Sequence, residues 1–197
     1  MSQEAPNPSA RQTELLEAAY QYALAHGLTD LSLRPLAEAI DSSPRVLLFL
    51  FENKDGLLRA LLARARADEL ALLDRARLPE DPAGLAPAIE RLWARLTAME
   101  HRPLLRLWAE AYTRSLVQPD GAWAGFARAT VEDWLNVLAD FQPLSERDSE
   151  DGGTRRTLAL AVLRGALFDL LATDDDVRLI AAVKHQLALL QADTTGG

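Results

Sequence analysis

The sequence predicts an all-α protein, with an N-terminal three-helix helix-turn-helix domain followed by a larger helical C-terminal domain. Apolar residues recur at helical spacing between turn-forming segments, and no segment alternates polar and apolar residues as a strand does. Hydrophobic residues make up 49% of the 197 residues, which is enough for a core. A chain of this length suits a small domain plus a medium one.

The composition excludes several classes of protein. The chain has no cysteine, so neither a disulfide framework nor a thiolate metal site is expected. It has no run of about 18 apolar residues, and its opening MSQEAPNPSA lacks the charged and apolar regions of a signal peptide. We therefore expect a soluble, cytoplasmic protein with no membrane partner. The net charge of −8 argues against indiscriminate binding of nucleic acid.

The N-terminal residues predict a short tail and a first helix. Residues 1–8 hold two prolines and no periodicity, which indicates disorder. Ser9 and Gln12 form a capping-box pattern, and the helix that they open should end at about His26, before Gly27. Its predicted buried stripe is Leu15, Leu16, Ala19, Tyr22 and Ala23.

The stretch 31–58 predicts two short helices and the start of a longer one. Ser32 is placed to cap the first short helix, whose apolar spacing continues to Ile40. Asp41 tolerates a left-handed turn, and Ser43 and Pro44 suit the cap and first position of the next helix.

That second helix should run from Pro44 to Phe51, and Asn53 should cap the chain again for Lys54 onward. Two short helices joined by a tight turn form a helix-turn-helix, whose second helix can enter a DNA major groove.

The segment from Arg11 to about Leu62 resembles the N-terminal domain of the TetR family of transcriptional regulators. The resemblance rests on four stretches, LLEAAYQYALAHGL, LSLRPLAEAI, SSPRVLLFLF and ENKDGLL. Three positions depart from the family pattern, since Asp41 stands where the family usually has Gly, and Leu48 and Leu50 where it usually has Tyr and His. The two leucines cannot hydrogen-bond to phosphates or bases.

The resemblance implies specific DNA contacts and a family architecture. Arg34 and Arg45 would read bases, Lys54 and Ser43 would contact phosphates, and Pro44 and Phe49 would make apolar base contacts. It also implies a double-stranded DNA operator, a small-molecule effector bound by the second domain, and a homodimer formed by the last two long helices. We place the DNA-binding domain at 9–56, with a connecting helix from about residue 54, and the ligand-binding and dimerisation domain at 57–197.

Further helices are expected along the C-terminal domain. The connecting helix should reach about Leu78, before a loop at 79–84. Helices should then span 85–100, 103–117, 122–141, 154–172 and 177–191. The polar segment 142–153 predicts a mobile loop, and 192–197 a disordered tail.

Aromatic residues gather in the middle helices. Such residues can enclose an apolar cavity, although an aromatic stripe at helical spacing is also typical of an ordinary core. The candidate ligand-binding residues are Trp93, Met99, Trp108, Tyr112, Phe126 and Trp134. Glu110 and Asp169 are candidate buried anchors within the same domain.

The last two expected helices, 154–172 and 177–191, carry small residues interleaved with large apolar ones. This pattern fits either of two arrangements: a four-helix interface between two copies related by a twofold axis, or a core within one chain. A dimer would hold two recognition helices about 34–36 Å apart, which matches successive major grooves. The candidate dimerisation residues are Leu158, Val162, Gly165, Ile180 and Leu187.

No enzyme signal is present, and no catalytic residue, metal site or cofactor is expected. The three histidines are widely separated, and no phosphate-binding glycine loop occurs. We therefore expect a ligand-responsive, TetR-like repressor released from its operator by an apolar or aromatic effector. The alternative is a helical dimeric ligand-binding or protein-interaction module with weakened DNA reading. Residues 1–66 carry a net charge of −1, which supports neither hypothesis by itself.

Overall fold

All regular structure in the described part of the chain is helical. The computed structural model describes residues 9–74 and 84–195, and no strand occurs within them. The elements are α1 (Ala10–His26), α2 (Leu33–Ala39), α3 (Pro44–Phe51), α4 (Lys54–Asp74), α5 (Leu85–Leu96), η1 (Met99–His101), α6 (Arg102–Val117), η2 (Gly121–Trp123), α7 (Phe126–Asp140), α8 (Leu144–Arg147), α9 (Glu150–Thr173) and α10 (Asp176–Thr195).

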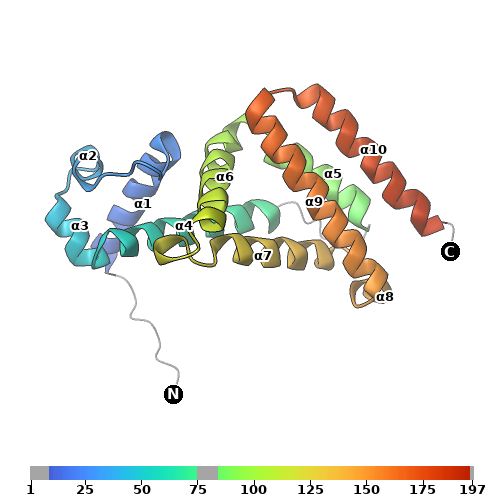
Figure 1. Cartoon of the computed structure of the whole chain (residues 1–197), viewed down its shortest axis with the longest axis horizontal. Helices are drawn as coiled ribbons and strands as arrows, with labels where there is room; N and C mark the ends of the chain where they lie inside the picture. Colours follow the sequence, from blue (N-terminus) through green and yellow to red (C-terminus); the bar gives the residue numbers. More distant parts are fainter. Residues whose placement is uncertain (1–8, 75–83, 196–197) are drawn as a thin grey trace, which may run out of the picture.

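The helices form an elongated body with two distinct ends (Figure 1). Helices α1, α2 and α3 gather at one end, and α9 and α10 lie at the other. Helix α4 runs from the first group toward the second and packs along α7, while α6 crosses both. Within the described residues, no helix is long and apolar enough to cross a membrane.

Local capping signals account for the N-terminal helices. The Ser9 hydroxyl accepts from the Gln12 N–H at 3.2 Å, and the Ser43 hydroxyl accepts from the Val46 N–H at 3.3 Å. Ser32 stands at the predicted cap position of α2, but its side chain makes no capping hydrogen bond, so that prediction was wrong. The predicted bounds of α3 are confirmed residue for residue.

The turns around α3 use unusual backbone conformations. Asp41 has a φ of 51°, as expected of a residue that replaces glycine in the turn, and Glu52 has a φ of 68° just after α3. Gly56 is required by a close approach, because a Cβ there would lie 2.0 Å from the Phe51 carbonyl oxygen. The Asn53 side chain accepts from the Gly56 N–H at 2.8 Å and so caps α4, as predicted.

The C-terminal half differs from the prediction in three places. The helix expected from residue 122 begins only at Phe126, because Gly125 adopts a left-handed φ of 74°. The segment expected to be a loop, 142–153, instead holds α8 and the first turn of α9, capped by Ser149 through the Gly152 N–H at 2.9 Å. Helix α10 continues to Thr195, into the expected tail. The predicted tail 1–8 and most of the predicted loop 79–84 lie outside the described residues.

Two hydrophobic cores hold the molecule together. One joins α1–α4 to α6 and the start of α7, and the other joins α5, α7, α9 and α10 to the end of α4. The N-terminal helices therefore do not form a separate core, because Leu107 and Ala111 of α6 are fully buried against them. In α1 the buried tyrosine is Tyr20, whereas the predicted Tyr22 is only partly buried.

Candidate DNA-binding and effector sites

Helix α3 presents an apolar face at one end of the molecule. Its inner face is buried through Leu47 and Phe51, whereas Phe49 is 84% exposed and Leu48 is 39% exposed. The Gln12 side chain donates to the Leu50 carbonyl at 2.9 Å, which ties α3 to α1. Helix α3 is thus held in place by its inner face, and the described residues leave its outer face uncovered.

The charges around α3 fall into two groups. Arg34, Arg45 and Lys54 are exposed and form no ion pair with any described residue. Arg64 instead pairs with Glu17 at 2.9 Å and with Asp68 at 2.6 Å, on the α1–α4 interface. The hydrogen bond from Arg64 lowers the pKa of the Glu17 carboxyl. Arg34, Arg45 and Lys54 are therefore available to a polyanion at this end of the molecule.

The six predicted ligand-binding residues do not form one cluster. Trp93 and Trp134 lie in the core shared with α9 and α10, whereas Trp108, Tyr112 and Phe126 lie in the core shared with α1–α4. Met99 is 77% exposed on η1 and lies apart from both groups. The aromatic residues are thus divided between the two cores.

One compact aromatic group does form between α6 and α9. The ring centroids of Trp108 and Phe168 lie 5.4 Å apart, and those of Trp108 and Tyr112 lie 5.2 Å apart. The Arg164 guanidinium lies 5.1 Å from the centroid of the Tyr112 ring, a cation–π geometry. Phe168 was not predicted, because it lies outside the aromatic-rich stretch of the sequence.

A buried carboxylate accompanies the aromatic residues. Glu69 of α4 is only 7% exposed, and its Oε1 accepts from the Trp134 indole N–H at 2.7 Å. Burial raises the pKa of Glu69 to about 7. The sequence carried a signal for it, because Glu69 falls on the apolar stripe that Leu62, Ala65 and Leu73 define.

Two other buried tryptophans differ from Trp134 in the hydrogen bonding of their indole N–H groups. The Nε1 atoms of Trp93 and Trp108 are buried and have no hydrogen-bond partner among the described residues. A buried donor without a partner costs free energy unless a water or ligand supplies an acceptor. The Trp108 indole is thus a ready donor beside the aromatic group.

Neither predicted carboxylate anchor serves that role. The Glu110 carboxylate accepts from the Leu28 N–H at 2.9 and 3.1 Å, on the side of α6 next to α1. Asp169 is exposed and pairs with Arg178 at 3.0 Å. The described residues also contain no group of three or more His, Asp or Glu side chains suited to a metal ion.

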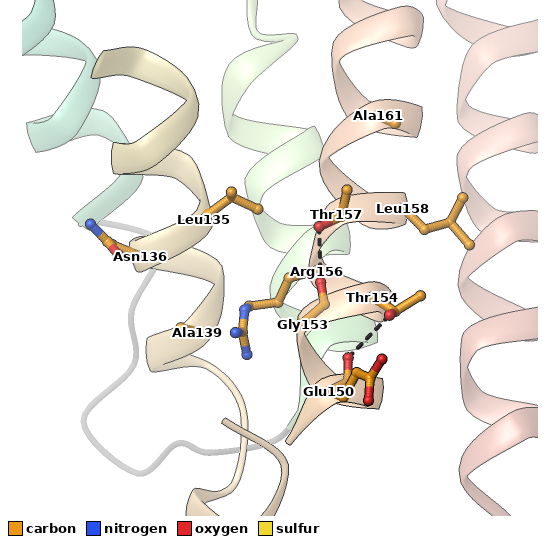
Figure 2. Close-up of a pocket in the computed structure, with 10 residues that line it drawn as sticks. All are labelled: Leu135, Asn136, Ala139, Glu150, Gly153, Thr154, Arg156, Thr157, Leu158 and Ala161. Atoms are coloured by element: carbon orange, nitrogen blue, oxygen red, sulfur yellow. Dashed lines mark hydrogen bonds between the residues drawn. The ribbon is translucent and has the colours of Figure 1, made fainter. Parts of the chain in front are cut away.

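An open groove lies between α7 and α9, with a volume of about 700 Å³. Leu135 and Ala139 line it from α7 and the stem of Arg156 from α9 (Figure 2). Its rim continues to Leu158 and Ala161, on the outer surface of α9. The groove is therefore continuous with the exposed face of α9.

The predicted dimerisation residues divide between surface and core. Leu158 is 47% exposed and Gly165 is exposed, while Val162 and Ile180 are partly buried. Leu187 is buried in the core of its own chain. Val177 is 76% exposed and Leu189 is 49% exposed, and both lie on α10, so α9 and α10 share an outer face rich in small and apolar side chains.

These features define a two-domain helix-turn-helix protein, with a short exposed second helix joined by a long helix to a larger all-helical body. The sequence matches no protein-family model and no curated protein. Solved structures are nevertheless similar over nearly the whole chain.

A transcriptional regulator from Rhodococcus sp. Rha1 has a TM-score of 0.74 at 22% identity, over 92% of this chain and 96% of that one. A TetR transcription regulator from Haloarcula marismortui has a TM-score of 0.72 at 18% identity, over 90% and 94% of the two chains. The multidrug binding protein EbrR, complexed with imidazole, has a TM-score of 0.69 at 22% identity, over 89% of each chain. The chain therefore has the fold of the TetR-family transcriptional regulators.

Proposed function

We propose that the chain is a homodimeric, effector-responsive transcriptional regulator that binds an operator through α3 and acts as a repressor. The observation that carries the proposal is the outer face of α3, which is held rigidly from behind by Leu47 and Phe51 and is left open in front. A short helix presented in this way suits entry into a major groove. The fold shared with solved transcriptional regulators supports the same function.

The proposed DNA contacts combine a few cations with apolar groups. Arg34 and Arg45 would read base edges, and Lys54 would contact a phosphate. Ser43 accepts the Val46 N–H with its oxygen, so its hydroxyl hydrogen is free to donate to a phosphate. Phe49 and Pro44 would contact thymine methyl groups. Leu48 and Leu50 supply no hydrogen bond to a base or a phosphate.

The proposed effector is a small apolar or aromatic molecule bound near α6. The group formed by Trp108, Tyr112 and Phe168 offers aromatic faces, and the unpartnered Trp108 N–H offers one directional donor. Small molecules of this kind bind sites lined by aromatic side chains with few polar groups. EbrR, with the same fold, is a multidrug binding protein, which supports a ligand-binding role for the larger domain.

The proposed dimer uses the outer face of α9 and α10. Gly165 favours this assignment, because a Cβ added there would meet no atom of its own chain within 4 Å. Its own chain therefore gives no packing reason for a glycine in the middle of a long helix, where glycine is destabilising. Close approach of a second helix would give one.

Effector binding would act through the spacing of the two α3 helices. An effector that binds more tightly to a conformation with the wrong spacing shifts the population away from the DNA-bound form. The shift of the population cannot exceed the difference between the effector's binding free energies for the two conformations.

The test is the binding of the full chain to duplex DNA that flanks its own gene, measured over a range of salt concentrations. A regulator that pairs cations with phosphates loses affinity steeply with salt, because counterions return to the DNA. Affinity that falls with salt and exceeds that for a scrambled duplex supports the proposal. No binding at any salt concentration contradicts it.

A second candidate is a protein-interaction module on the same scaffold. Val46, Leu48 and Phe49 form an exposed apolar strip, and the carboxylates of Glu52 and Asp55 are exposed just beyond it. Such a strip suits a protein partner as well as thymine methyls. This candidate predicts no DNA affinity at any salt concentration, so the same titration separates the two.

A further inference from the structure

We infer that Glu110 of α6 is a positioning residue that fixes the orientation of the helix-turn-helix unit relative to the C-terminal domain. Its two carboxylate oxygens accept from the Leu28 N–H at 3.1 and 2.9 Å, and Oε1 also accepts from the Thr29 hydroxyl. Leu28 and Thr29 lie in the turn between α1 and α2. One side chain of the larger domain therefore holds the turn that leads into the helix-turn-helix.

The carboxylate fits closely against that turn. Gly27 ends α1 with a φ of 79°, and a Cβ at Gly27 would lie 2.9 Å from Glu110 Oε2. The Gly27 N–H is already used by the Ala23 carbonyl at 2.8 Å, so the Leu28 N–H is the first donor beyond the helix. Glycine at position 27 thus leaves space for the carboxylate.

The placement of this charge works against the helix dipole. The C-terminus of α1 carries partial negative charge, which disfavours a nearby carboxylate. The Leu28 N–H and the Thr29 hydroxyl offset this repulsion, because hydrogen bonds to an ionised acceptor are stronger than neutral ones. Both carboxylate oxygens accept, whereas an amide has one accepting oxygen and one donating NH2 group, so Glu110→Gln can keep only part of the contact.

The opposite side of α6 carries the proposed effector-binding group. Trp108 and Tyr112 lie two residues before and after Glu110, which places them about 200° away around the helix axis. They pack on Phe168 of α9, whereas Glu110 faces α1. A shift or rotation of α6 caused by a ligand at Trp108 would move Glu110 and the turn that it holds. This last step rests on the proposed function; the positioning role does not.

The test compares Glu110→Ala and Glu110→Gln with the wild-type chain through two measurements. The first is the hydrogen exchange rate of the Leu28 amide, with the Leu61 amide as a reference for the buried core. The second is the distance between spin labels at Glu38→Cys and Arg128→Cys, in labelled chain diluted with unlabelled chain. Both sites are exposed, and the chain has no cysteine of its own.

We expect both variants to speed exchange of the Leu28 amide by about tenfold or more while Leu61 is unchanged, and to broaden the label distance. Unchanged exchange at Leu28 and an unchanged distance would overturn the inference. Equal acceleration at Leu28 and Leu61 with an intact distance would also overturn it, because that result shows general destabilisation only.

Two control variants accompany the test: one removes the charge of a different carboxylate, and the other changes a residue of α6 close to Glu110. Glu100→Gln removes a carboxylate that is 79% exposed, and Thr113→Ala removes a hydroxyl that bonds only within α6. Both should leave the Leu28 exchange and the label distance as in the wild type. Absence of DNA binding by the wild-type chain would contradict the proposed function and leave these two measurements valid.

Discussion

The Trp134 indole donates to the Glu69 carboxylate across 2.7 Å, and both side chains are buried. Glu69 comes from α4, the helix that follows α3, and Trp134 comes from α7 in the larger domain. The hydrogen bond therefore ties α4 to α7, and Glu69 is the most deeply buried carboxylate among the described residues.

The stability of the protein should depend on pH through Glu69. Its pKa is raised to about 7 from 4.5, so the folded state binds more protons than the unfolded state between these values, and stability falls as pH rises through that range. Glu69→Gln, which stays neutral, should lose this dependence and gain about 1–3 kcal/mol over wild type near pH 8. Chemical unfolding at several pH values measures the unfolding free energy of both proteins.

The exposed Glu132→Gln on α7 serves as the control for that measurement. It should follow the wild-type pH dependence. Parallel curves for wild type and Glu69→Gln would show that the Glu69 carboxyl does not titrate with a raised pKa.

Phe49 and Phe51 should behave oppositely when replaced by alanine. Phe49 is 84% exposed, so Phe49→Ala should change the unfolding free energy by no more than about 0.5 kcal/mol while weakening DNA binding. Phe51 is 6% exposed, so Phe51→Ala should cost about 3–5 kcal/mol of stability. Urea unfolding and DNA titration together test the pair. A strong loss of stability in Phe49→Ala would mean that its side chain packs on something.

Arg34→Ala should weaken binding to the operator by about 1–3 kcal/mol if Arg34 reads a guanine. The side chain is exposed and makes no ion pair with the described residues, so the fold should not change. Fluorescence anisotropy with labelled duplex measures the affinity. Arg95→Ala removes an exposed cation from α5, at the other end of the molecule (Figure 1), and should have no such effect. Equal affinities for wild type and Arg34→Ala would remove Arg34 from the contacts.

Gly165 offers a test of the proposed dimer. In an isolated chain, Gly165→Leu meets open space and should stabilise α9 by about 0.5–1 kcal/mol through helix propensity. In a dimer that packs α9 closely on a second copy, the same change should separate the chains. Sedimentation of wild type, Gly165→Leu and the control Ala94→Leu, an exposed site on α5, distinguishes these results. A Gly165→Leu dimer as tight as wild type would place the interface elsewhere.

The sequence predicted the helix-turn-helix well because its signals are local. Ser43, Pro44 and Asn53 each act within three residues of their own position, so the bounds of α3 could be predicted residue for residue. The start of α7 was missed because glycine and alanine at 124–125 look compatible with a helix until Gly125 adopts a left-handed φ. Polarity at 142–153 was mistaken for a loop, although Ser149 caps a helix there.

The candidate sites were less predictable because their contacts are distant in sequence. Glu69 meets Trp134 across 65 positions, and Glu110 meets Leu28 across 82. Position in an apolar stripe could have indicated the burial of Glu69, but nothing local indicates its partner. The aromatic residues were expected to lie together because they are close in sequence. Their positions on different helices and helix faces instead place them in two separate cores.

The distance between the two α3 helices in solution tests the central claim most directly. A single spin label at Glu38→Cys, an exposed site on α2 next to α3 and outside the proposed DNA contacts, reports it by dipolar spectroscopy in a chain without other cysteines. We expect coupling between two copies, at a label distance consistent with α3 helices about 34–36 Å apart when duplex operator is bound. Absence of coupling, or a distance that no pair of successive major grooves can match, would contradict it.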